Sequence, residues 1–452
     1  MRTTDNNCGK DIKELSENEL SETAIDDLQL IANQKIKNIR LEKHPNLFIF
    51  PPNDSEYGDE IGDGTIFSLD DTTLTTNNIM GFVGVNNTRL TITSRFAQND
   101  DNDYFLHYML QRVLSINAVH LDQSKNKESI WDFLPYLFPY YLKRAVSQGI
   151  YRKYRIIKNN DLNIRGAVDI KRHLNLNIPF LGKVAYTNRI YSADNEVTEL
   201  IRHTIEEINN RRMSQILKSD KDTIDAVQQI ISATETYDKN ARNKIISKNL
   251  KPVNHPYFYK YKELQKLCRL ILRHDKLTFG DEKDRIFGLL FDGAWLWEEY
   301  LGKILNNKFI HPQNKTGTHV NYLFQNENDK PVQEIYPDFI SIKKPVIIAD
   351  AKYKFLDNTR YEKDYGRHDY FQILAYMFRF TSSSGYLLFP YRQNDGQSFY
   401  KEELTIKDTN SKLTKLGLAI PQKPLDFKLF ISEIKKNEAD FINAVNIDDK
   451  LS

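Results

Sequence analysis

The chain has 452 residues, 40% of them hydrophobic and 27% charged, a composition that excludes a disordered or fibrous protein. Its 63 Lys and Arg nearly balance its 61 Asp and Glu. The resulting net charge of +2 excludes a uniformly basic nucleic-acid binder, so any DNA-binding surface must be local. The length exceeds one ordinary hydrophobic core and predicts two or three domains.

The sequence shows no features of a secreted or membrane protein. No apolar run reaches membrane-spanning length, and residues 1–20 lack the apolar core of a signal peptide. Cys8 and Cys268 lie far apart and form neither a metal-binding pattern nor a disulfide framework. We therefore expect a cytoplasmic protein without a membrane partner.

The first half of the chain passes from strand signals to helix signals. Residues 1–45 are polar and predict a leader that becomes helical. Strand signals then run from Leu47 to Phe96, and the segments "IMGFVGV" and "LTITSRF" predict a hairpin with Asn86 and Asn87 in its turn. Apolar residues at three- and four-residue spacing then predict helices. These helices cover residues 105–114, 131–146 and much of 194–250.

The C-terminal part predicts a small mixed sheet flanked by helices, in the order helix, three strands, helix, strand. In chain order the segments are 293–305, 318–324, 337–342, 345–353, 368–380 and 385–390. A short turn at 343–345 joins the second and third strands, and Asp369 is able to cap the second helix.

The stretch "EIYPDFISIKKPVIIADAKYKF" (334–355) places charged residues on otherwise apolar strands. Side chains two apart on a strand share a face, so Asp350 and Lys352 point to one side. If the two strands pair as an antiparallel hairpin, Asp338 lies close to both. Because buried charges need partners, we expect these three side chains to converge on one point.

Two carboxylates and an amine in this arrangement suit metal-dependent phosphodiester hydrolysis. Adjacent carboxylates raise each other's pKa unless a cation lies between them, and Mg²⁺ prefers oxygen ligands. The two aspartates and the backbone carbonyl of Ala351 are candidate ligands, and Lys352 would orient the attacking water and offset transition-state charge. The alternative is a surface hairpin with solvated charges, since the acid-x-Lys triplet also occurs at residues 11–13 and 169–171.

Neighbouring helices offer three supporting candidates. Glu298 lies near the edge of the apolar stripe of helix 293–305, where it could reach the metal or its waters, whereas Glu299 faces another direction. Gln372 and Tyr376 are four residues apart and share a helix face, from which both can hydrogen-bond to a phosphate or a carboxylate. A solvated glutamate pair, a core tyrosine and a rim glutamine would give the same pattern.

Pro337-Asp338 followed by Asp350-Ala351-Lys352 resembles the signature of the PD-(D/E)XK nuclease superfamily, as does the order of the surrounding helices and strands. More narrowly, the chain is similar to the McrC-like nuclease subunits of McrBC-type restriction systems, especially the LlaJI-type branch. The stretches that support the narrower resemblance are 81–96, 162–174, 191–205, 296–301 and 370–378.

The resemblance implies an α+β multidomain fold in three parts. These are a polar and helical leader (1–45), an N-terminal β-rich and helical domain (46–250), and a C-terminal PD-(D/E)XK nuclease domain (251–452) with an αβββαβ mixed sheet flanked by helices. The N-terminal domain would dock on a partner, and a β-hairpin such as 80–96 is one candidate contact.

The resemblance also implies an activity and partners. Asp338, Asp350 and Lys352 would form the catalytic core, with Glu298, Gln372 and Tyr376 in support. The cofactor would be Mg²⁺, with Mn²⁺ as a substitute. The partners would be double-stranded DNA, an AAA+ GTPase ring of the McrB type, and a companion DNA methyltransferase in some systems. The sequence has no phosphate-binding loop, so we expect no nucleotide to be bound by this chain alone.

Residues 143–172 hold nine Lys and Arg against two acids, with Tyr151 and Tyr154 between them. Such a stretch can contact DNA phosphates or an acidic partner surface, and it can also be a solvated face. None of these uses reads base sequence. The candidate DNA or partner contacts are Arg144, Arg152, Lys153, Arg155, Arg165, Lys171 and Arg172.

Two other functions stay open at this point. One is a non-catalytic subunit that activates a GTPase, against which the three intact residues of the nuclease signature argue. The other is a RecB-like DNA repair nuclease, which is disfavoured because two cysteines cannot hold an iron–sulfur cluster.

Overall fold

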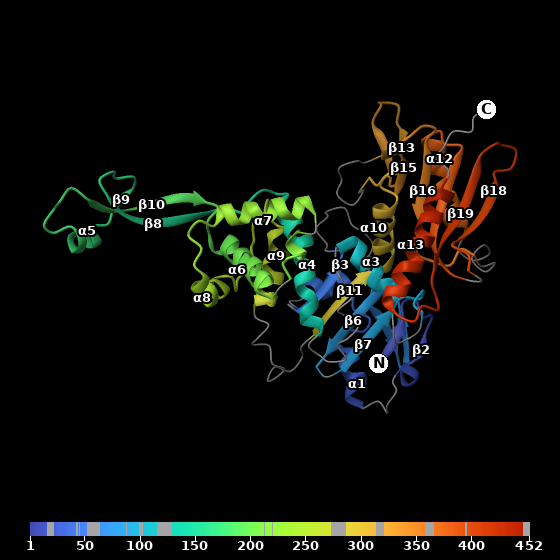
Figure 1. Cartoon of the computed structure of the whole chain (residues 1–452), viewed down its shortest axis with the longest axis horizontal. Coiled ribbons are helices and arrows are strands. Elements are labelled where there is room, and N and C mark those ends of the chain that lie inside the picture. The colour runs from blue at the N-terminus through green and yellow to red at the C-terminus, as the bar shows by residue number, and fades with distance from the viewer. Residues whose placement is uncertain are drawn as a thin grey trace. The chain divides into compact units, whose positions relative to one another are not determined.

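The computed structural model describes residues 1–15, 22–41, 44, 46–51, 64–86, 88–98, 103–114, 129–211, 213–218, 220–272, 286–312, 321–357, 366–393 and 396–445. The chain divides into two compact units (Figure 1). Unit 1 combines residues 1–120 and 281–452, and unit 2 comprises residues 121–280. No helix in the described ranges is both long and apolar enough to cross a bilayer.

A five-stranded sheet explains why unit 1 is built from two separate segments of the chain. Its order is β1-β7-β6-β11-β3. The strands are β1 (Arg2–Thr4), β3 (Asn46–Phe50), β6 (Ile79–Val85), β7 (Thr88–Thr93) and β11 (Ile286–Asp292). β11 pairs antiparallel with β6 and parallel with β3. This long-range pairing corrects the expected linear division into 1–45, 46–250 and 251–452.

The described residues of 1–45 are part of the core of unit 1 and not a separate leader, contrary to expectation. β1 pairs with β7, and β2 (Lys10–Asp11) joins a small sheet with β5 (Thr73–Thr76) and β4 (Phe67–Asp70). Helices η1 (Ile12–Leu15), α1 (Glu22–Gln29) and α2 (Ile36–Leu41) lie nearby. Ile12, Leu28 and Ile39 are buried among apolar strand residues. The segment is polar on average, but its few apolar residues pack into a single hydrophobic core.

The hairpin expected near residues 80–96 is confirmed. β6 and β7 pair antiparallel, with Val85 opposite Thr88, and Asn86 adopts a φ of 51° in the turn. Asparagine tolerates this left-handed conformation better than most residues, which suits it to a tight two-residue turn.

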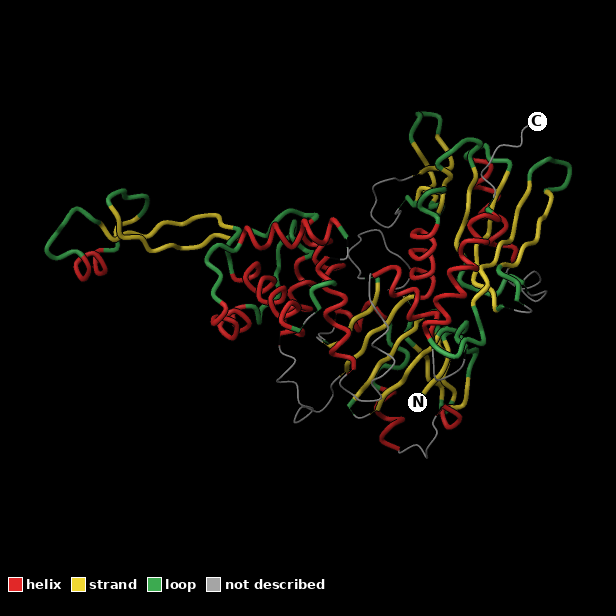
Figure 2. The backbone as a smooth tube through the Cα atoms, in the orientation of Figure 1, coloured by secondary structure: helices red, strands yellow, loops and turns green. Residues whose placement is uncertain are grey.

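A second, six-stranded sheet in unit 1 has the order β12-β15-β16-β17-β19-β18. Figure 2 draws the strands of the chain as yellow tubes. The strands are β12 (Phe309–Ile310), β15 (Phe339–Ser341), β16 (Ile347–Ala351), β17 (Ser384–Arg392), β18 (Phe399–Thr405) and β19 (Lys412–Ile420). β16, β17 and β19 run parallel to one another, while β12, β15 and β18 pair antiparallel. The expected mixed sheet is therefore confirmed, and residues 399–420 extend it.

Two expected details of this region are wrong. Residues 321–325 form β13, which pairs with β14 (Pro331–Ile335) in a separate ribbon, while β12 lies beside β15 in the sheet. The rest of the expected strand 318–324 lies outside the described residues. Helix α12 (Gly366–Arg379) begins before Asp369, so this side chain does not cap its start.

Helices cover the second sheet through close contacts. A Cβ added at Gly385 would lie 2.5 Å from the sulfur of Met377, so the glycine allows α12 to pack directly on β17. Three further helices are held together by the buried carboxylate of Glu438, which lies on one of them. Glu438 accepts hydrogen bonds from Tyr108 at 2.8 Å and from Tyr300 at 2.6 Å on the other two. These helices are α3 (Tyr104–Leu114), α10 (Gly293–Ile304) and α13 (Phe427–Ala444).

Unit 2 is a helical bundle that carries a long ribbon of two strands, to which a short third strand, β9 (Ala167–Val168), is added (Figure 1). The helices are α4 (Ser129–Val146), α6 (Glu196–Asn210), η4 (Ile216–Lys218), α7 (Lys221–Ala233), η5 (Lys239–Ala241), α8 (Arg242–Lys248) and α9 (Tyr261–Leu272). β8 (Lys153–Asp161) and β10 (Val184–Ser192) pair antiparallel along all nine residues of each strand. β9 and α5 (Ile170–Leu176) lie between them in sequence. The helices expected in 131–146 and 194–250 are confirmed.

Candidate active site

The antiparallel pair β15–β16 brings two carboxylates together in unit 1. Phe339 lies opposite Ala349 and Ile340 opposite Ile348, a register that places Asp338 opposite Asp350. Oδ2 of Asp338 accepts a hydrogen bond from the backbone N–H of Ala351 at 2.8 Å. The short turn and the two-residue period of the strands therefore produce the convergence that the sequence predicts.

Lys352 joins the same cluster from the end of β16. Its Nζ lies 2.5 Å from Oδ2 of Asp350 and 3.6 Å from Oδ1 of Asp369. The backbone N–H of Lys352 donates to the carbonyl of Leu388 on β17 at 2.8 Å, which anchors the residue to the sheet. The ammonium is therefore held inside the acidic cluster.

The helix α12 supplies a hydrogen-bonded pair behind Lys352. Oε1 of Gln372 accepts a hydrogen bond from Nζ of Lys352 at 2.8 Å, and Nε2 of Gln372 donates to the hydroxyl of Tyr376 at 2.9 Å. Because the two side chains are one helical turn apart, they form a short chain that directs the lysine. The structure thus joins both predicted helix residues to the cluster.

Burial and repulsion shift the proton affinities of the cluster. Burial raises the pKa of Asp338 well above its usual range, and the charges of Glu298 and Asp350 raise it further. Burial also raises the pKa of Asp350, against the lowering effect of Lys352. Burial favours neutral Lys352, but Asp350 and Asp369 outweigh it and raise the lysine pKa above its ordinary value. Crowded carboxylates with raised pKa values are typical of a site that binds a cation.

Glu298 approaches the cluster from α10 together with a histidine. Nδ1 of His311 donates to the backbone carbonyl of Asp338 at 2.9 Å. Its Nε2 lies 3.7 Å from Glu298 and 3.8 Å from Glu299. The imidazole stacks on Phe339, with ring centroids 5.1 Å apart. Glu298 is therefore positioned beside Asp338 by His311.

Mg²⁺ prefers oxygen ligands, and the cluster supplies carboxylate oxygens. Among the described residues, no three His, Cys, Asp or Glu side chains form a ready metal cage, so Glu298 does not complete one with the two aspartates. Mg²⁺ does not require such a cage, because it keeps several waters and is commonly held by one or two carboxylates. Oδ2 of Asp350 is buried and forms no well-oriented hydrogen bond within the described chain, although Lys352 lies close. The two aspartates fit this ion, and the backbone carbonyl of Ala351 stays a predicted ligand.

The seven basic candidates all lie in unit 2, and several are already paired. Lys153 forms an ion pair with Glu196, and Arg155 lies 3.5 Å from Asp194. Arg172 donates to the backbone carbonyls of two ribbon residues. Arg144 donates to the hydroxyl of Tyr140 at 2.7 Å. The side chains of Arg152, Arg165 and Lys171 are exposed, so these three are the most accessible to a partner or DNA.

Two residues of the cluster, His311 and Asp369, were not predicted as site residues. His311 stood among histidines without ligand spacing, so no local signal marked it. Asp369 pairs with Lys352 and, at 2.6 Å, with Lys354. Gln372 and Tyr376 follow Asp369 by three and seven residues, so all three lie on one face of the helix. This spacing could have drawn attention to Asp369.

Comparison with known proteins gives a family. Residues 74–390 match the model of the McrBC 5-methylcytosine restriction system component family. A comparison with curated protein sequences gave no match.

Two solved structures resemble the chain, both with low sequence identity. One is a half-complex of Thermococcus gammatolerans McrB AAA+ hexamers with bound McrC. The similarity has 14% identity and a TM-score of 0.48, and it covers 99% of this chain and 100% of that chain. The other is a Thermococcus gammatolerans McrBC complex. There the identity is 13% and the TM-score 0.31, with 68% of this chain and 87% of that chain covered. The family match spans most of the chain, which therefore belongs to the McrBC 5-methylcytosine restriction system component family.

Proposed function

We propose that this chain is the Mg²⁺-dependent DNA endonuclease subunit of a restriction system, with a PD-(D/E)XK active site of the LlaJI-type branch. The observation that supports the proposal is the meeting of Asp338, Asp350 and Lys352 at the edge of β15 and β16. A structural hairpin has no need for two buried carboxylates and a buried ammonium, since such groups are costly to desolvate.

Each residue has a role that follows from its contacts. Asp338, Asp350 and the carbonyl of Ala351 would hold the ion. When bound, Mg²⁺ supplies Lewis acidity to a phosphoryl oxygen and lowers the pKa of a coordinated water. Lys352 keeps its proton, so it would donate a hydrogen bond to the attacking water and offset charge at the phosphate. Gln372 and Tyr376 would hold Lys352 in place, and Glu298 would reach the site through a water.

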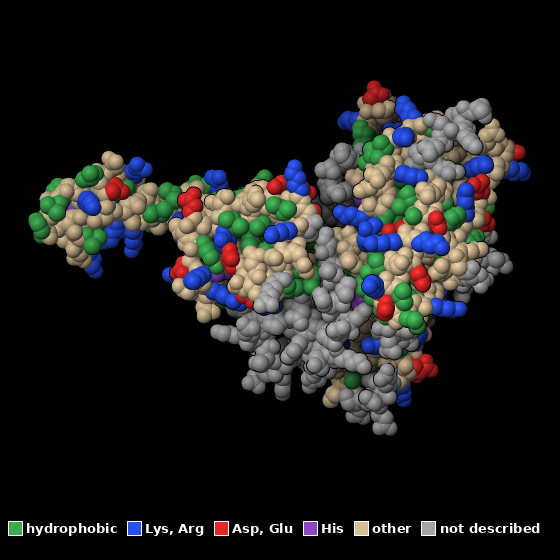
Figure 3. All heavy atoms as spheres, viewed as in Figure 1, with side chains coloured by type: hydrophobic (Ala, Val, Ile, Leu, Met, Phe, Trp, Pro, Cys, Tyr) green, Lys and Arg blue, Asp and Glu red, His purple; other side chains and the backbone are tan. Residues whose placement is uncertain are grey.

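We further propose that the activity requires an AAA+ GTPase ring whose GTP hydrolysis this chain stimulates. A restriction system component acts with other chains. The docking surface follows from exposure within unit 2. Residues 153–192, here called the β8–β10 ribbon, carry exposed apolar side chains such as Ile156 at 72% and Leu181 at 83% (Figure 3). Exposed apolar clusters on a protein surface mark interaction sites.

This surface replaces the hairpin 80–96 as the proposed contact. β6 and β7 lie inside the five-stranded sheet, with β11 on one side and β1 on the other. Their backbone hydrogen bonds are therefore already made within the protein, and no free strand edge is offered to another chain.

The same ribbon would serve the alternative function, a non-catalytic activator of the GTPase. The two functions differ only in whether the cluster around Asp350 cuts DNA. Phosphate contacts do not read base sequence, so the experiment compares methylated with unmethylated DNA as the target. Preference for unmethylated DNA would support a companion methyltransferase that protects the host.

The test is plasmid cleavage by this chain with Mg²⁺, GTP and the GTPase encoded beside it, on methylated and unmethylated DNA. Wild type is compared with Asp350→Ala and with Asp357→Ala, which removes an exposed carboxylate nearby. We expect wild type to cleave DNA only with its partner, and Asp350→Ala to abolish this cleavage. EDTA should also abolish cleavage by wild type, and added Mn²⁺ should restore it. Asp357→Ala should cleave like wild type. Cleavage that survives Asp350→Ala would place the nuclease elsewhere. Raised GTP turnover without any cleavage would make the chain an activator.

A further inference from the structure

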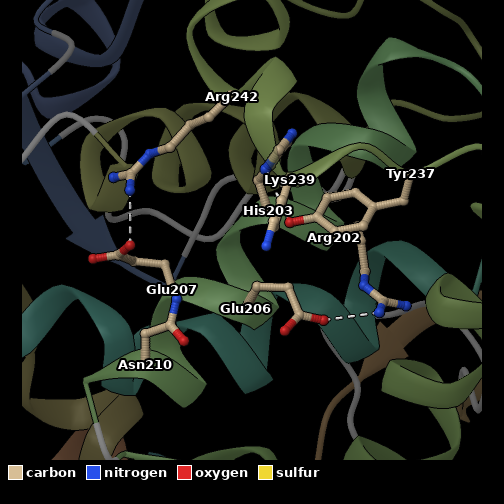
Figure 4. A pocket seen from close by; sticks show the side chains of 8 residues that line it. All are labelled: Arg202, His203, Glu206, Glu207, Asn210, Tyr237, Lys239 and Arg242. Atoms are coloured by element: carbon tan, nitrogen blue, oxygen red, sulfur yellow. Dashed lines mark hydrogen bonds and ion pairs between the residues drawn. The ribbon is translucent and has the colours of Figure 1, made fainter.

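A polar pocket lies in the helical bundle of unit 2. It has a volume of about 330 Å³ and is lined by residues of α6, of η5 and of the segments beside η5 (Figure 4). Arg202, His203 and Glu206 come from α6, while Tyr237 and Lys239 come from the other side. The pocket belongs to unit 2 alone, so it is separate from the Asp338 cluster.

Two nitrogen atoms in this pocket are buried without a hydrogen-bond partner among the described residues. They are Nε2 of His203, whose residue is only 4% exposed, and Nε of Arg202. Leaving a buried polar group unpaired is costly, so two such groups in one pocket point to a bound acceptor. The pocket is large enough to contain it.

Nε2 of His203 is a donor when the hydroxyl of Tyr237 donates to Nδ1 of the same ring. Its ring lies beside Tyr237, with centroids 4.7 Å apart, and its Nδ1 is 3.2 Å from the tyrosine hydroxyl (Figure 4). Burial raises the pKa of Tyr237, so the hydroxyl keeps its proton and can donate to Nδ1. Burial, assisted by Arg242, lowers the pKa of His203 and favours a neutral ring. In that arrangement the single imidazole N–H is on Nε2.

Three positive side chains line the pocket, those of Arg202, Lys239 and Arg242, together with two carboxylates. A third carboxylate, Asp238, lies beside the lining and acts on His203 and Tyr237. Glu206 pairs with Arg202 at 2.8 Å, and Glu207 pairs with Arg242 at 2.9 Å and with Arg211 at 2.8 Å. Both carboxylates are thus neutralised by guanidinium groups. Lys239 also lines the pocket and forms no ion pair within the described part of the chain. Its ammonium is available to a ligand.

We propose that this pocket binds the phosphate group of a small ligand. A phosphate offers several strong acceptor oxygens, which match the unpaired N–H groups of Arg202 and His203 and the ammonium of Lys239. A neutral apolar ligand would leave these donors unpaired. Free phosphate and a nucleoside monophosphate share the required chemistry, and the experiment separates them.

The test is calorimetric titration of the full chain with inorganic phosphate, GMP and a short DNA duplex, at constant ionic strength. We expect saturable binding of phosphate or GMP that Lys239→Ala weakens at least tenfold. Lys221→Ala removes an exposed lysine on α7 outside the pocket and should leave binding unchanged. His203→Phe, which removes the donor, should weaken binding more than His203→Gln, which keeps one.

The outcomes separate the possible ligands. Tighter binding of GMP than of phosphate would assign a nucleotide, and the reverse would assign the free ion. Because Lys239 is exposed, its variant tests the pocket even if the His203 variants unfold. The proposal is wrong if wild type binds neither small ligand, if it binds only the duplex, or if Lys239→Ala and Lys221→Ala behave alike.

Discussion

The ammonium of Lys352 lies 2.5 Å from Oδ2 of Asp350, while that of Lys354, two residues later, lies 2.6 Å from Oδ2 of Asp369. Lys352 is mostly buried and also bonds to Gln372, whereas Lys354 is 36% exposed. Two neighbouring lysines therefore occupy different places relative to the two carboxylates, and the proposed mechanism assigns a role to Lys352 alone.

Replacing each lysine by methionine should separate these places. We expect Lys352→Met to reduce partner-dependent cleavage by about 100-fold or more, the size of effect seen when a charge-stabilising donor is lost. Lys354→Met should reduce it less than about tenfold, because a partly exposed ion pair contributes little. The measurement is the cleavage rate of each variant, with its thermal unfolding as a control for folding. Equal losses of cleavage in two folded variants would contradict the assignment of Lys352.

Glu298 and Glu299 offer a second matched comparison on α10. We expect Glu298→Gln to raise the Mg²⁺ concentration needed for cleavage by roughly 10-fold, a typical effect of groups that orient metal ligands. Glu299→Gln should shift it less, because Glu298 is the nearby charge that contributes most to the raised pKa of Asp338. Cleavage measured across a Mg²⁺ series tests this. A larger shift in Glu299→Gln would assign the role to the other glutamate.

The β8–β10 ribbon predicts a partner-specific defect. Ile156→Ser combined with Leu181→Ser should reduce the stimulated GTP hydrolysis of the partner by at least about tenfold, since apolar anchors dominate interface energies. Folding should be unaffected within about 0.5 kcal/mol because both positions are exposed. Leu250→Ser changes an exposed leucine on the helical bundle and is the control. Normal stimulation by the ribbon variant would exclude this surface.

Asp220 predicts a pH-dependent contribution to the stability of unit 2. Burial alone would raise its pKa, but hydrogen bonds from Lys143 at 2.8 Å and from Thr223 outweigh this and lower it to about 2. A carboxyl with a depressed folded-state pKa stabilises the fold above its unfolded value, and this stability is lost as pH falls toward 2. Because the side chain is 34% exposed, we discount the contribution to about 1 kcal/mol.

Urea unfolding of wild type and Asp220→Asn between pH 2.5 and about pH 7 measures this contribution. The asparagine keeps an oxygen for the helix start but loses the charge. We expect the variant to be less stable at neutral pH, with the difference shrinking as pH falls below about 4. A difference that stays constant with pH would show that the hydrogen bonds to the helix, and not the ion pair, are responsible.

Both antiparallel hairpins that local pattern predicts are confirmed, whereas the expected domain bounds, which depend on distant strand partners, are not. The antiparallel pairs near Asn86 and across the turn 343–345 depend on turn chemistry and strand period, which neighbouring residues specify. The polar average of residues 1–45 predicted a leader, but Ile12 and Leu28 are buried in the core of unit 1. The strand expected at 318–324 was placed in the wrong sheet because its pattern does not identify its neighbour.

The sequence by itself determined that Asp338, Asp350 and Lys352 meet, because side chains alternate along strands and a short turn leaves one pairing. Only the tertiary structure decided what surrounds them. His311 arrives from the segment after α10, and Asp369 from a helix that packs across β17. Likewise, β11 joins β3 and β6 far away in the chain. Hydrogen bonds and packing between such distant segments depend on the assembled core, and they leave no mark in local periodicity.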